Sequence, residues 1–258
     1  MDKYVEFIQS VYRLTGLDLG LYKEKQMKRR ISSLVARNNF KDFDDYFLGI
    51  KNDKKLYSEF INYLTINVSE FYRNPNQWAV LQNKIVPDLI KKYGKLNVWS
   101  SAGSTGEEPY SLVMMLSNFF KLKDINVTAT DIDDGAIAKA SAGIYGEKSL
   151  TNLPKEFVSK YFSKNSNGMY AISDEIKSRV KYKKFNLLKD SYLKNQHLIL
   201  CRNVMIYFTE EAKAGMYTKF HDSLTDDGVF FVGSTEQIIL PNRYKLKPVE
   251  TFFYKKSE

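Results

Sequence analysis

The sequence offers little sulfur or imidazole chemistry. It holds one cysteine, Cys201, and two histidines, His197 and His221, among 258 residues. A single cysteine excludes a disulfide within the chain, and so few thiols and imidazoles leave almost nothing from which to build a zinc site. We therefore expect a protein without a metal cofactor.

Long apolar runs are also missing. No stretch approaches the roughly 20 consecutive apolar residues that cross a bilayer, and residues 1–6 lack the apolar core of a signal peptide. The chain is still 43% hydrophobic and 14% aromatic, which is too rich in core-forming residues for a disordered protein. These features predict a folded cytoplasmic protein that does not insert into a membrane.

Acidic residues are outnumbered by basic ones. The 39 lysines and arginines against 30 aspartates and glutamates give a formal net charge of +9. Such a charge favours an acidic partner, which can be a nucleic acid, an anionic membrane or an acidic protein surface. Charge alone does not choose among these classes.

Apolar residues recur at helical spacing in the first part of the chain. The groups begin near Tyr4, Met27, Phe43 and Leu56, with short polar breaks between them. A polar segment, residues 65–75, follows. We predict that residues 1–75 form a small all-helical domain and a linker.

Residues 76–258 begin with a helix that is kinked or broken at Pro87 and ends at Gly94, and then β-rich runs alternate with helices. That alternation is typical of an α/β domain with a parallel sheet. The last two runs, 244–249 and 251–255, are expected to pair as an antiparallel edge. Between 146 and 179 no clear crossover helix is seen and Asn167-Gly168 indicates a hairpin, so we expect a small β-rich insertion there.

The strongest chemical signal is segment 98–111, VWSSAGSTGEEPYS, in which a strand runs through small residues into the start of a helix. Small side chains let a ligand approach the backbone. The segment is neither a P-loop nor a G-x-G-x-x-G motif, because no lysine follows Gly106 and only Gly103 and Gly106 are glycines. Glu107 and Glu108 disfavour phosphate and suit an ammonium group or hydroxyls. The alternative is an ordinary turn whose acidic pair is favoured by the helix dipole.

A second acidic segment, ATDID at residues 129–133, ends the next predicted strand. A carboxylate at that place holds ribose hydroxyls in Rossmann-like sites, and we assign that role to Asp131. Asp133 is expected to cap the following helix instead. A nucleoside that lacks phosphates and carries an amino acid moiety suggests S-adenosylmethionine, which we expect as the cofactor.

In these two motifs and four others the sequence resembles the chemotaxis receptor glutamate O-methyltransferases, the CheR family, over nearly its whole length. The further motifs are TINVSEFYR at 65–73, FNLL at 185–188, CRNVMIYF at 201–208 and GSTE at 233–236. Each is weak alone, but six in order at family-like spacing make coincidence implausible. The resemblance implies a Rossmann-like S-adenosylmethionine-dependent methyltransferase sheet at 76–258, with the helical domain before it and the β-insertion within it.

The resemblance also places particular residues at the cofactor. They come from five segments of the chain: Asn67, Ser69 and Arg73 in the linker, Gly103 and Glu108 at the small-residue turn, Asp131, Asn186 with Leu187, and Arg202 with Asn203. Among them, Glu108 would bind the amino group of the cofactor, Asp131 its ribose, and the pair at 186–187 its adenine side.

The implied reaction transfers a methyl group from S-adenosylmethionine to glutamate side chains of methyl-accepting chemotaxis receptors. It forms glutamyl methyl esters in chemotactic adaptation and leaves S-adenosylhomocysteine. A glutamate with a pKa of about 4.3 is already an anion near neutral pH, so no general base is required. Arg73 is the expected clamp for the incoming carboxylate, because its planar fork holds a carboxylate directionally; the alternative is an exposed, solvated arginine. Tyr207 would position the methyl group or the acceptor, or it is a core aromatic residue.

A basic segment, Lys23–Arg37, lies on the second predicted helix. Lys23, Arg30 and Arg37 recur at heptad spacing and share one face. By resemblance this face docks the acidic cytoplasmic helices of the receptors, which would recruit the cytoplasmic enzyme to membrane receptors. The alternative is a solvated helix surface.

Two other functions suit the same cofactor fold. A nucleic-acid or other small-substrate methyltransferase would also explain the positive charge, but the sequence has no Asn-Pro-Pro-Tyr or Asp-Pro-Pro-Tyr motif, and Leu200 instead of proline precedes Cys201. A non-catalytic S-adenosylmethionine-sensing module would keep the pocket without an acceptor site, and the presence of Arg73 and Tyr207 argues against it. We therefore expect no nucleic-acid partner.

Overall fold

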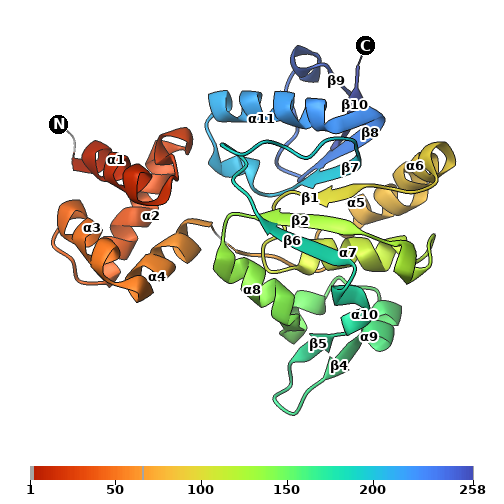
Figure 1. Ribbon diagram of the computed structural model, residues 1–258, viewed down its shortest axis with the longest axis horizontal. Coiled ribbons are helices and arrows are strands. Elements are labelled where there is room, and N and C mark those ends of the chain that lie inside the picture. Colours follow the sequence, from red (N-terminus) through yellow and green to blue (C-terminus); the bar gives the residue numbers. More distant parts are fainter. Residues whose placement is uncertain (1–2, 66, 258) are drawn as a thin grey trace. The chain divides into compact units, whose positions relative to one another are not determined.

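The chain divides into two units in the computed structural model of Figure 1, which describes residues 3–65 and 67–257. The first unit comprises Met1–Ile66 and Met205–Gly215, and the second comprises Asn67–Val204 and Met216–Glu258. Residues 67–75, which we expected to continue the helical domain as a linker, thus group with the second unit. The physical reason is that Phe71 and Tyr72 are buried in its hydrophobic core.

The first unit contains the helices that the apolar spacing predicts. They are α1 (Lys3–Thr15), α2 (Glu24–Arg37), α3 (Phe43–Asn52) and α4 (Lys54–Thr65), with a 3-10 turn at Leu19–Leu21. Phe7 of α1 lies in the core of this unit, where its ring contacts those of Phe43, Tyr46 and Phe60. Aromatic burial therefore holds these short helices together.

A later segment of the chain returns to the first unit. A 3-10 turn, Met205–Tyr207, precedes α11 (Glu210–Ser223), and the division between the units falls within that helix. The Lys23 amide donates to the Tyr207 carbonyl at 2.9 Å, and the Thr209 amide donates to the Leu21 carbonyl at 2.9 Å. These backbone bonds hold the returning segment beside the start of α2.

Within the described residues, the second unit is built on a seven-stranded sheet in the order β6-β2-β1-β7-β8-β10-β9. The strands are β1 (Val98–Ser100), β2 (Val127–Asp131), β6 (Val180–Lys184), β7 (Gln196–Cys201), β8 (Leu224–Val232), β9 (Leu246–Glu250) and β10 (Phe253–Lys256). The strands from β6 to β8 run parallel, and β10 pairs antiparallel with β8 and β9. The predicted parallel sheet with an antiparallel edge is confirmed.

Helices cover this sheet (Figure 1). They are α5 (Pro75–Val80), α6 (Val86–Tyr93), α7 (Glu107–Leu116), α8 (Asp134–Ala142) and the end of α11, with 3-10 turns at Leu122–Asp124 and Pro241–Tyr244. α7 and α8 pack against β2 and β6, and Phe220 of α11 stacks on Phe230 of β8. The break expected at Pro87 takes the form of a π-helical segment, Leu81–Ile85, because proline donates no hydrogen bond to the preceding turn.

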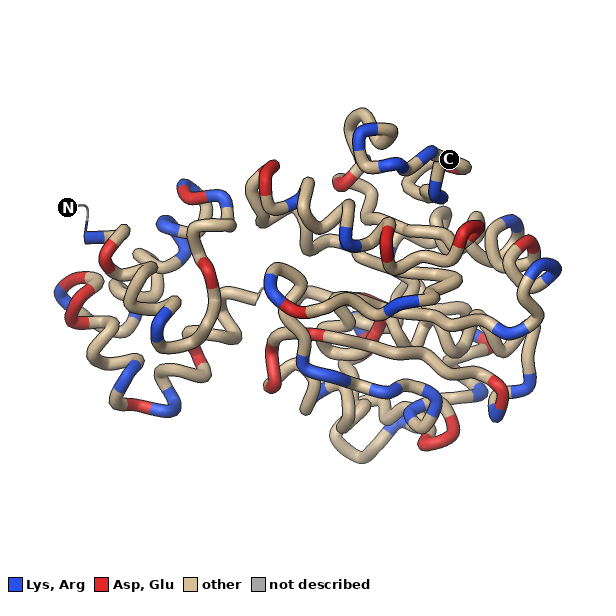
Figure 2. The backbone as a smooth tube through the Cα atoms, turned by 45° about the horizontal axis from the view of Figure 1, so that its top comes forward, with Lys and Arg blue, Asp and Glu red and all other residues tan. Residues whose placement is uncertain are grey.

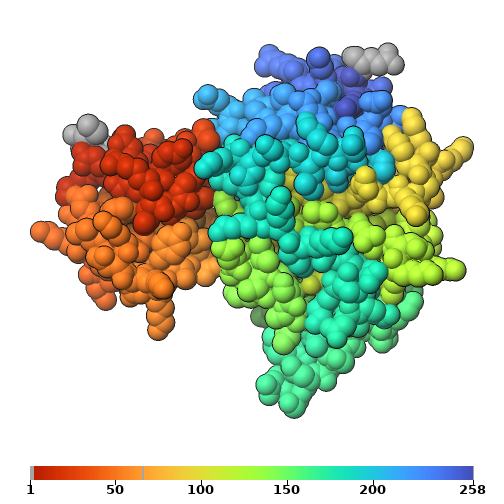
Figure 3. All heavy atoms as spheres, in the orientation of Figure 1, coloured from red at the N-terminus to blue at the C-terminus, as the bar shows by residue number. Residues whose placement is uncertain are grey.

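The insertion is a small sheet with short helices, and Figure 3 shows it protruding from the rest of the second unit. It contains β3 (Ile144–Tyr145), a 3-10 turn at Glu147–Leu150, α9 (Lys155–Tyr161), β4 (Phe162–Lys164), β5 (Tyr170–Ile172) and α10 (Asp174–Lys177). β4 and β5 form the predicted antiparallel hairpin. We expected a β-rich insertion without a clear crossover helix, and the structure adds the short helix α9, which buries Phe157 and Tyr161 one turn apart. Its seven residues are too few to show a helical period in the sequence.

The strand order reverses direction between β1 and β7. From β1 the chain moves to β2 and β6 on one side, and later to β7 and β8 on the other. In open α/β sheets, ligands bind at the carboxyl ends of the strands beside such a switch point. The residues that follow β1, β2 and β7 are therefore where a site is expected.

Among the described residues, no helix is long and apolar enough to cross a membrane.

Candidate active site

Asp131 ends β2, and its carboxylate is bound to the neighbouring loops. Its Oδ2 accepts from the Ser104 amide at 2.8 Å, and its Oδ1 accepts from the Asp133 amide at 3.0 Å. Burial raises the pKa of Asp131, and these backbone donors oppose the rise. Asp133 caps α8 as expected, because its side chain accepts from the amides of Gly135 and Ala136.

Asn67, the first residue of the second unit, connects the same two loops. Its Nδ2 donates to Asp133 Oδ2 at 2.7 Å, and its Oδ1 accepts from the Ser104 hydroxyl at 2.8 Å. The linker residue, the small-residue turn and the loop after β2 therefore form one hydrogen-bonded cluster around Asp131.

The pair Asn186-Leu187 lies beside Asp131 because β6 is the neighbour of β2. The Phe185 amide continues the ladder by donating to the Asp131 carbonyl at 2.8 Å. Asn186 Oδ1 accepts from the Leu188 amide at 2.9 Å, which fixes the turn that follows the strand. Leu187 is buried. The structure thus brings this pair next to the end of β2, and its contact with the adenine side of the cofactor stays a prediction.

The small-residue turn is a tight connection between β1 and α7. Gly106 adopts a φ of 101°, and a Cβ there would lie 2.6 Å from the Tyr145 hydroxyl. A Cβ at Gly103 would lie 3.3 Å from the Ala129 Cβ. The turn itself therefore favours glycine at position 106, whereas a side chain at Gly103 would require Ala129 to shift slightly. A ligand contact at Gly103 stays a prediction.

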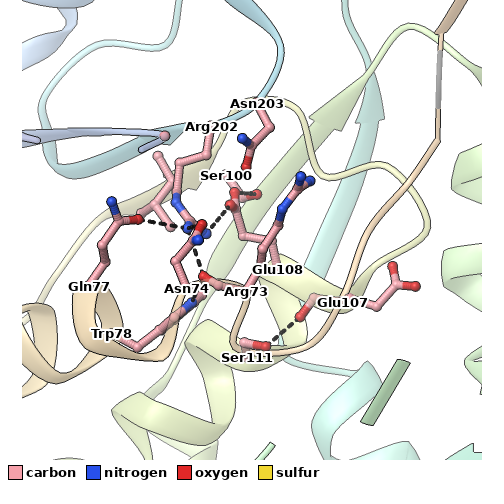
Figure 4. A network of polar contacts seen from close by, with 12 residues as sticks. Arg73, Asn74, Gln77, Trp78, Ser100, Glu107, Glu108, Ser111, Arg202 and Asn203 are labelled. Atoms are coloured by element: carbon pink, nitrogen blue, oxygen red, sulfur yellow. Dashed lines mark hydrogen bonds and ion pairs between the residues drawn. The ribbon is translucent and has the colours of Figure 1, made fainter. Parts of the chain in front are cut away.

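The two glutamates that begin α7 point in different directions (Figure 4). Glu107 Oε2 accepts from the Thr105 hydroxyl at 2.6 Å, and Ser69 also hydrogen-bonds to this carboxylate. Glu108 Oε1 accepts from the Ser100 hydroxyl at 2.8 Å. Burial raises the pKa of both carboxyls.

Arg202 follows β7 and pairs with Glu108. Its Nη1 lies 3.3 Å from Glu108 Oε2, and the Arg202 side chain is only 2% exposed. Burial raises the pKa of Glu108, and this guanidinium opposes the rise. The buried pair joins the carboxyl end of β7 to the start of α7 at the switch point of the sheet.

Arg73 lies on the turn before α5, next to this pair. Its carbonyl accepts from Arg202 Nη2 at 2.8 Å, and its own Nη1 donates to the Val68 carbonyl at 3.2 Å. In Figure 4 its guanidinium extends away from the buried Arg202 guanidinium. The structure therefore brings Arg73, Glu108 and Arg202 into one network.

Glu236 is a site residue that we did not assign from the sequence. Its Oε2 accepts from the Asn203 amide at 2.5 Å and from the Gly233 amide at 2.9 Å. Asn203 has a φ of 59°, and this carboxylate holds it in that left-handed conformation. The available signal was the acidic residue in the GSTE motif directly after β8.

Tyr207 belongs to the first unit, so it is not among the residues that the second unit brings together. Its carbonyl accepts the bond from the Lys23 amide described above. A role for its side chain in the reaction stays a prediction.

The donor set of the second unit fits S-adenosylmethionine. Asp131 at the end of β2 and Glu108 at the start of α7 are half-buried carboxylates beside the switch point, and they suit ribose hydroxyls and an ammonium group. Residues 101–106 carry no lysine or arginine, and α7 begins with two glutamates, which disfavours a phosphate at this helix end. The strand order and these carboxylates define the class of S-adenosylmethionine-dependent methyltransferases.

Comparison with known proteins identifies the family within that class. Residues 67–253 match the CheR methyltransferase, SAM binding domain, and residues 2–65 match the CheR methyltransferase, all-alpha domain. The chemotaxis protein methyltransferase of Listeria innocua is 42% identical over 98% of this chain and 97% of its own length. That of Borreliella burgdorferi is 32% identical over 95% of this chain and 94% of its own length. The chain belongs to the CheR methyltransferase family and is an S-adenosylmethionine-dependent methyltransferase.

Proposed function

We propose that the protein methylates glutamate side chains of methyl-accepting chemotaxis receptors and forms glutamyl methyl esters. One observation carries this proposal: the Arg73 carbonyl is held by the buried Arg202, while the Arg73 guanidinium extends away from that of Arg202 and stays partly exposed (Figure 4). A guanidinium in that place can bind a carboxylate acceptor in a defined orientation. The chemotaxis methyltransferases among the relatives support the receptors as the source of that carboxylate.

Residues of the second unit would hold the cofactor by its polar ends. Asp131 would accept from the ribose hydroxyls, Glu108 would bind the ammonium group, and the 186–187 pair would border the adenine. When bound, S-adenosylmethionine supplies a methyl group activated by its sulfonium. Asn67, which hydrogen-bonds to the loops around Asp131, would keep these loops in place.

The acceptor needs no proton removed by the protein, because a glutamate with a pKa of about 4.3 is ionised near neutral pH. Glu107 is already bound to the Thr105 hydroxyl and to Ser69. The task left to the protein is alignment of the reacting groups. Arg73 would fix the acceptor carboxylate, and Tyr207 would position the methyl group or the acceptor. S-adenosylhomocysteine is the second product.

The docking face for the receptor would be the basic helix α2, whose basic residues differ in what they contact. The guanidinium groups of Arg30 and Arg37 lie 4.5 Å and 5.1 Å from the centre of the Tyr63 ring, and Arg37 also pairs with Glu59. These two arginines therefore contribute to the packing of α2 on α4. Lys25 and Arg29 are exposed and lie one turn apart. We propose Lys25 and Arg29 as the receptor-contacting cations, which would recruit the enzyme to membrane receptors.

The positive charge also suits a nucleic-acid substrate, but Figure 2 shows lysine and arginine spread along both units and interspersed with acidic residues. A nucleic-acid site usually gathers its cations on one face. This distribution supports a protein acceptor.

The test is a transfer assay with methyl-labelled S-adenosylmethionine and two acceptors, the cytoplasmic domain of a chemotaxis receptor and total RNA. We expect label on the receptor that mild alkali releases as methanol, because carboxyl methyl esters hydrolyse under conditions that leave N-methyl groups intact. Label on RNA, or alkali-stable label on the receptor, would contradict the proposal. Cofactor binding without any transfer would favour a sensing module instead.

A further inference from the structure

Arg202 is an unusual residue for this site because its charge is almost completely enclosed. Its guanidinium carbon lies 4.7 Å from the centre of the Phe231 ring and 5.8 Å from that of Trp78. Only 2% of the side chain is exposed. A buried guanidinium is costly unless its donors are bound, so its partners indicate what it does.

Those partners lie in the turn that carries Arg73, in the following helix α5 and at the start of α7 (Figure 4). Arg202 Nη2 donates to the Arg73 carbonyl at 2.8 Å, to Gln77 Oε1 at 3.0 Å and to Asn74 Oδ1 at 3.2 Å. Nη1 pairs with Glu108 Oε2 at 3.3 Å. A planar fork can reach the turn and Glu108 at the same time, and a lysine ammonium group cannot.

The Arg73 carbonyl is held from a second direction. Trp78 Nε1 donates to it at 3.1 Å, and the Trp78 ring stacks on Tyr72 at 4.8 Å. Arg73 also stands between two residues in the left-handed region, Tyr72 with a φ of 51° and Asn74 with a φ of 62°. Such conformations are rare for residues other than glycine and persist where the surroundings hold them.

We propose that Arg202 is a positioning residue for Arg73. With Trp78 it fixes the Arg73 carbonyl, and the fixed backbone directs the Arg73 guanidinium to the acceptor carboxylate. Arg202 thereby also ties the position of this turn to Glu108, the residue expected to bind the cofactor. The proposal rests on the acceptor-binding role of Arg73 given above, and it differs from a direct contact between Arg202 and the cofactor.

The clearest variant is Trp78→Phe, because it removes the Nε1 donor to Arg73 and keeps an aromatic ring against Tyr72. We expect it to lower the kcat for methyl transfer by roughly tenfold to a hundredfold, the range for a misaligned reacting group. The affinity for S-adenosylhomocysteine, measured by calorimetry, should change by less than about twofold, because Trp78 has no part in the cofactor-binding set. Arg202→Lys should lower the kcat at least as much.

The matched control is Trp99→Phe. Trp99 is also fully buried, and its Nε1 donates to Thr130 Oγ1 at 2.9 Å, away from the Arg73 turn. Both variants lose one buried hydrogen bond and one indole ring, so their melting temperatures should fall by similar amounts. Only Trp78→Phe should have a lower kcat than the wild type. An equal loss of kcat in Trp99→Phe would mean general loosening of the unit and would overturn the proposal.

A double variant shows whether the effect passes through Arg73. In the Arg73→Lys background the guanidinium is gone, so adding Trp78→Phe should lower the remaining kcat by less than about twofold. If Trp78→Phe costs the same factor in both backgrounds, Arg73 is not the intermediary and the proposal fails.

Amide hydrogen exchange separates this proposal from the choice of acceptor. Arg202→Lys and Trp78→Phe should speed exchange of the peptide covering residues 68–75 more than that of other peptides of the second unit, whatever the substrate is. Unchanged exchange in that peptide would overturn the positioning role even if the receptor is methylated. Faster exchange in an enzyme that labels no carboxylate would instead point to a wrong acceptor.

Discussion

At the scale of single residues, Asp131 is the most direct probe of the cofactor site. Asp131→Asn keeps one oxygen for a backbone amide and replaces the other with a donor. We expect the affinity for S-adenosylhomocysteine to weaken by about 1–3 kcal/mol, the range for a lost bond to a charged group. Asp134→Asn is the control, because Asp134 is exposed on α8 and should leave the affinity unchanged. A folded Asp131→Asn variant with normal affinity would remove this residue from the site.

His197 offers a residue-scale prediction about pH. Its Nδ1 accepts from the Asn97 amide at 2.8 Å, which requires the neutral ring, and burial lowers the pKa of His197 below 6.5. The unfolded chain therefore binds this proton more readily, so the stabilisation by His197 is present above pH 6.5 and is lost as the pH falls through the lower, folded-state pKa.

Thermal unfolding at a series of pH values checks this expectation. Between about pH 7.5 and pH 5.5 the melting temperature of the wild type should fall further than that of His197→Gln. Identical pH profiles for the two proteins would show that His197 titrates alike in both states.

Site residues differ in how far the sequence reveals them. Asp131 and Asp133 could be assigned because a carboxylate that ends a strand or caps a helix leaves a local pattern. The contact between Arg202 and Arg73 joins residues 129 positions apart, and no local pattern records it. Glu236 stands in the GSTE motif, but the motif does not show its contact with Asn203, which lies 33 positions earlier.

At the scale of elements, the turn before α7 depends on Gly106. Its φ is 101°, and a Cβ at this position would lie only 2.6 Å from the Tyr145 hydroxyl, which leaves no room for a side chain. Gly106→Ala should therefore lower the free energy of unfolding by about 1–3 kcal/mol. Denaturant unfolding followed by circular dichroism measures this. A variant as stable as the wild type would show that the turn adapts easily.

Gly215 gives the opposite expectation. It lies exposed within α11, where a Cβ would meet nothing within 4 Å. Gly215→Ala should raise the free energy of unfolding by about 0.4–1 kcal/mol, because alanine loses less backbone entropy in a helix. The same denaturation measurement applies, and a lower stability would contradict the assignment of this residue to an unstrained helix interior.

Elements with a long apolar period could be predicted from the sequence, and short ones could not. α1 and the parallel strands carry their own periodicity, whereas the seven residues of α9 do not. The π-helical segment before Pro87 could be predicted only as an irregularity, because the sequence does not say how the chain absorbs the missing donor.

At the scale of the whole molecule, the division into units could be predicted only in part. The switch from helical to alternating periodicity marks the main boundary, since each domain type leaves a pattern over many residues. The return of Met205–Gly215 to the first unit could not be foreseen. In the sequence, that segment looks like an ordinary connection from β7 to α11. Its bonds to Leu21 and Lys23 join residues far apart in the chain, so no local pattern indicates them.

Charge reversal on α2 tests docking of the receptor. Lys25→Glu with Arg29→Glu should reduce receptor methylation strongly at low salt and less at high salt, because exposed charges are screened over about 10 Å at 0.1 M. Affinity for S-adenosylhomocysteine should not change. Lys54→Glu with Lys55→Glu is the control, since it makes the same charge change at exposed positions on α4. Equal effects of both pairs, or none at any salt concentration, would exclude this face.

The most direct test of the proposed chemistry measures two properties of the Arg73→Ala variant: its rate of receptor methylation and its thermal stability. Among the described residues, the Arg73 guanidinium donates one hydrogen bond, to the Val68 carbonyl, so the melting temperature should stay within about 2 °C of the wild type. Methyl transfer, followed as alkali-labile label on the receptor, should fall at least about a hundredfold because the acceptor loses its clamp. A variant that melts normally and still methylates the receptor at the wild-type rate would contradict the assignment of Arg73 to the acceptor.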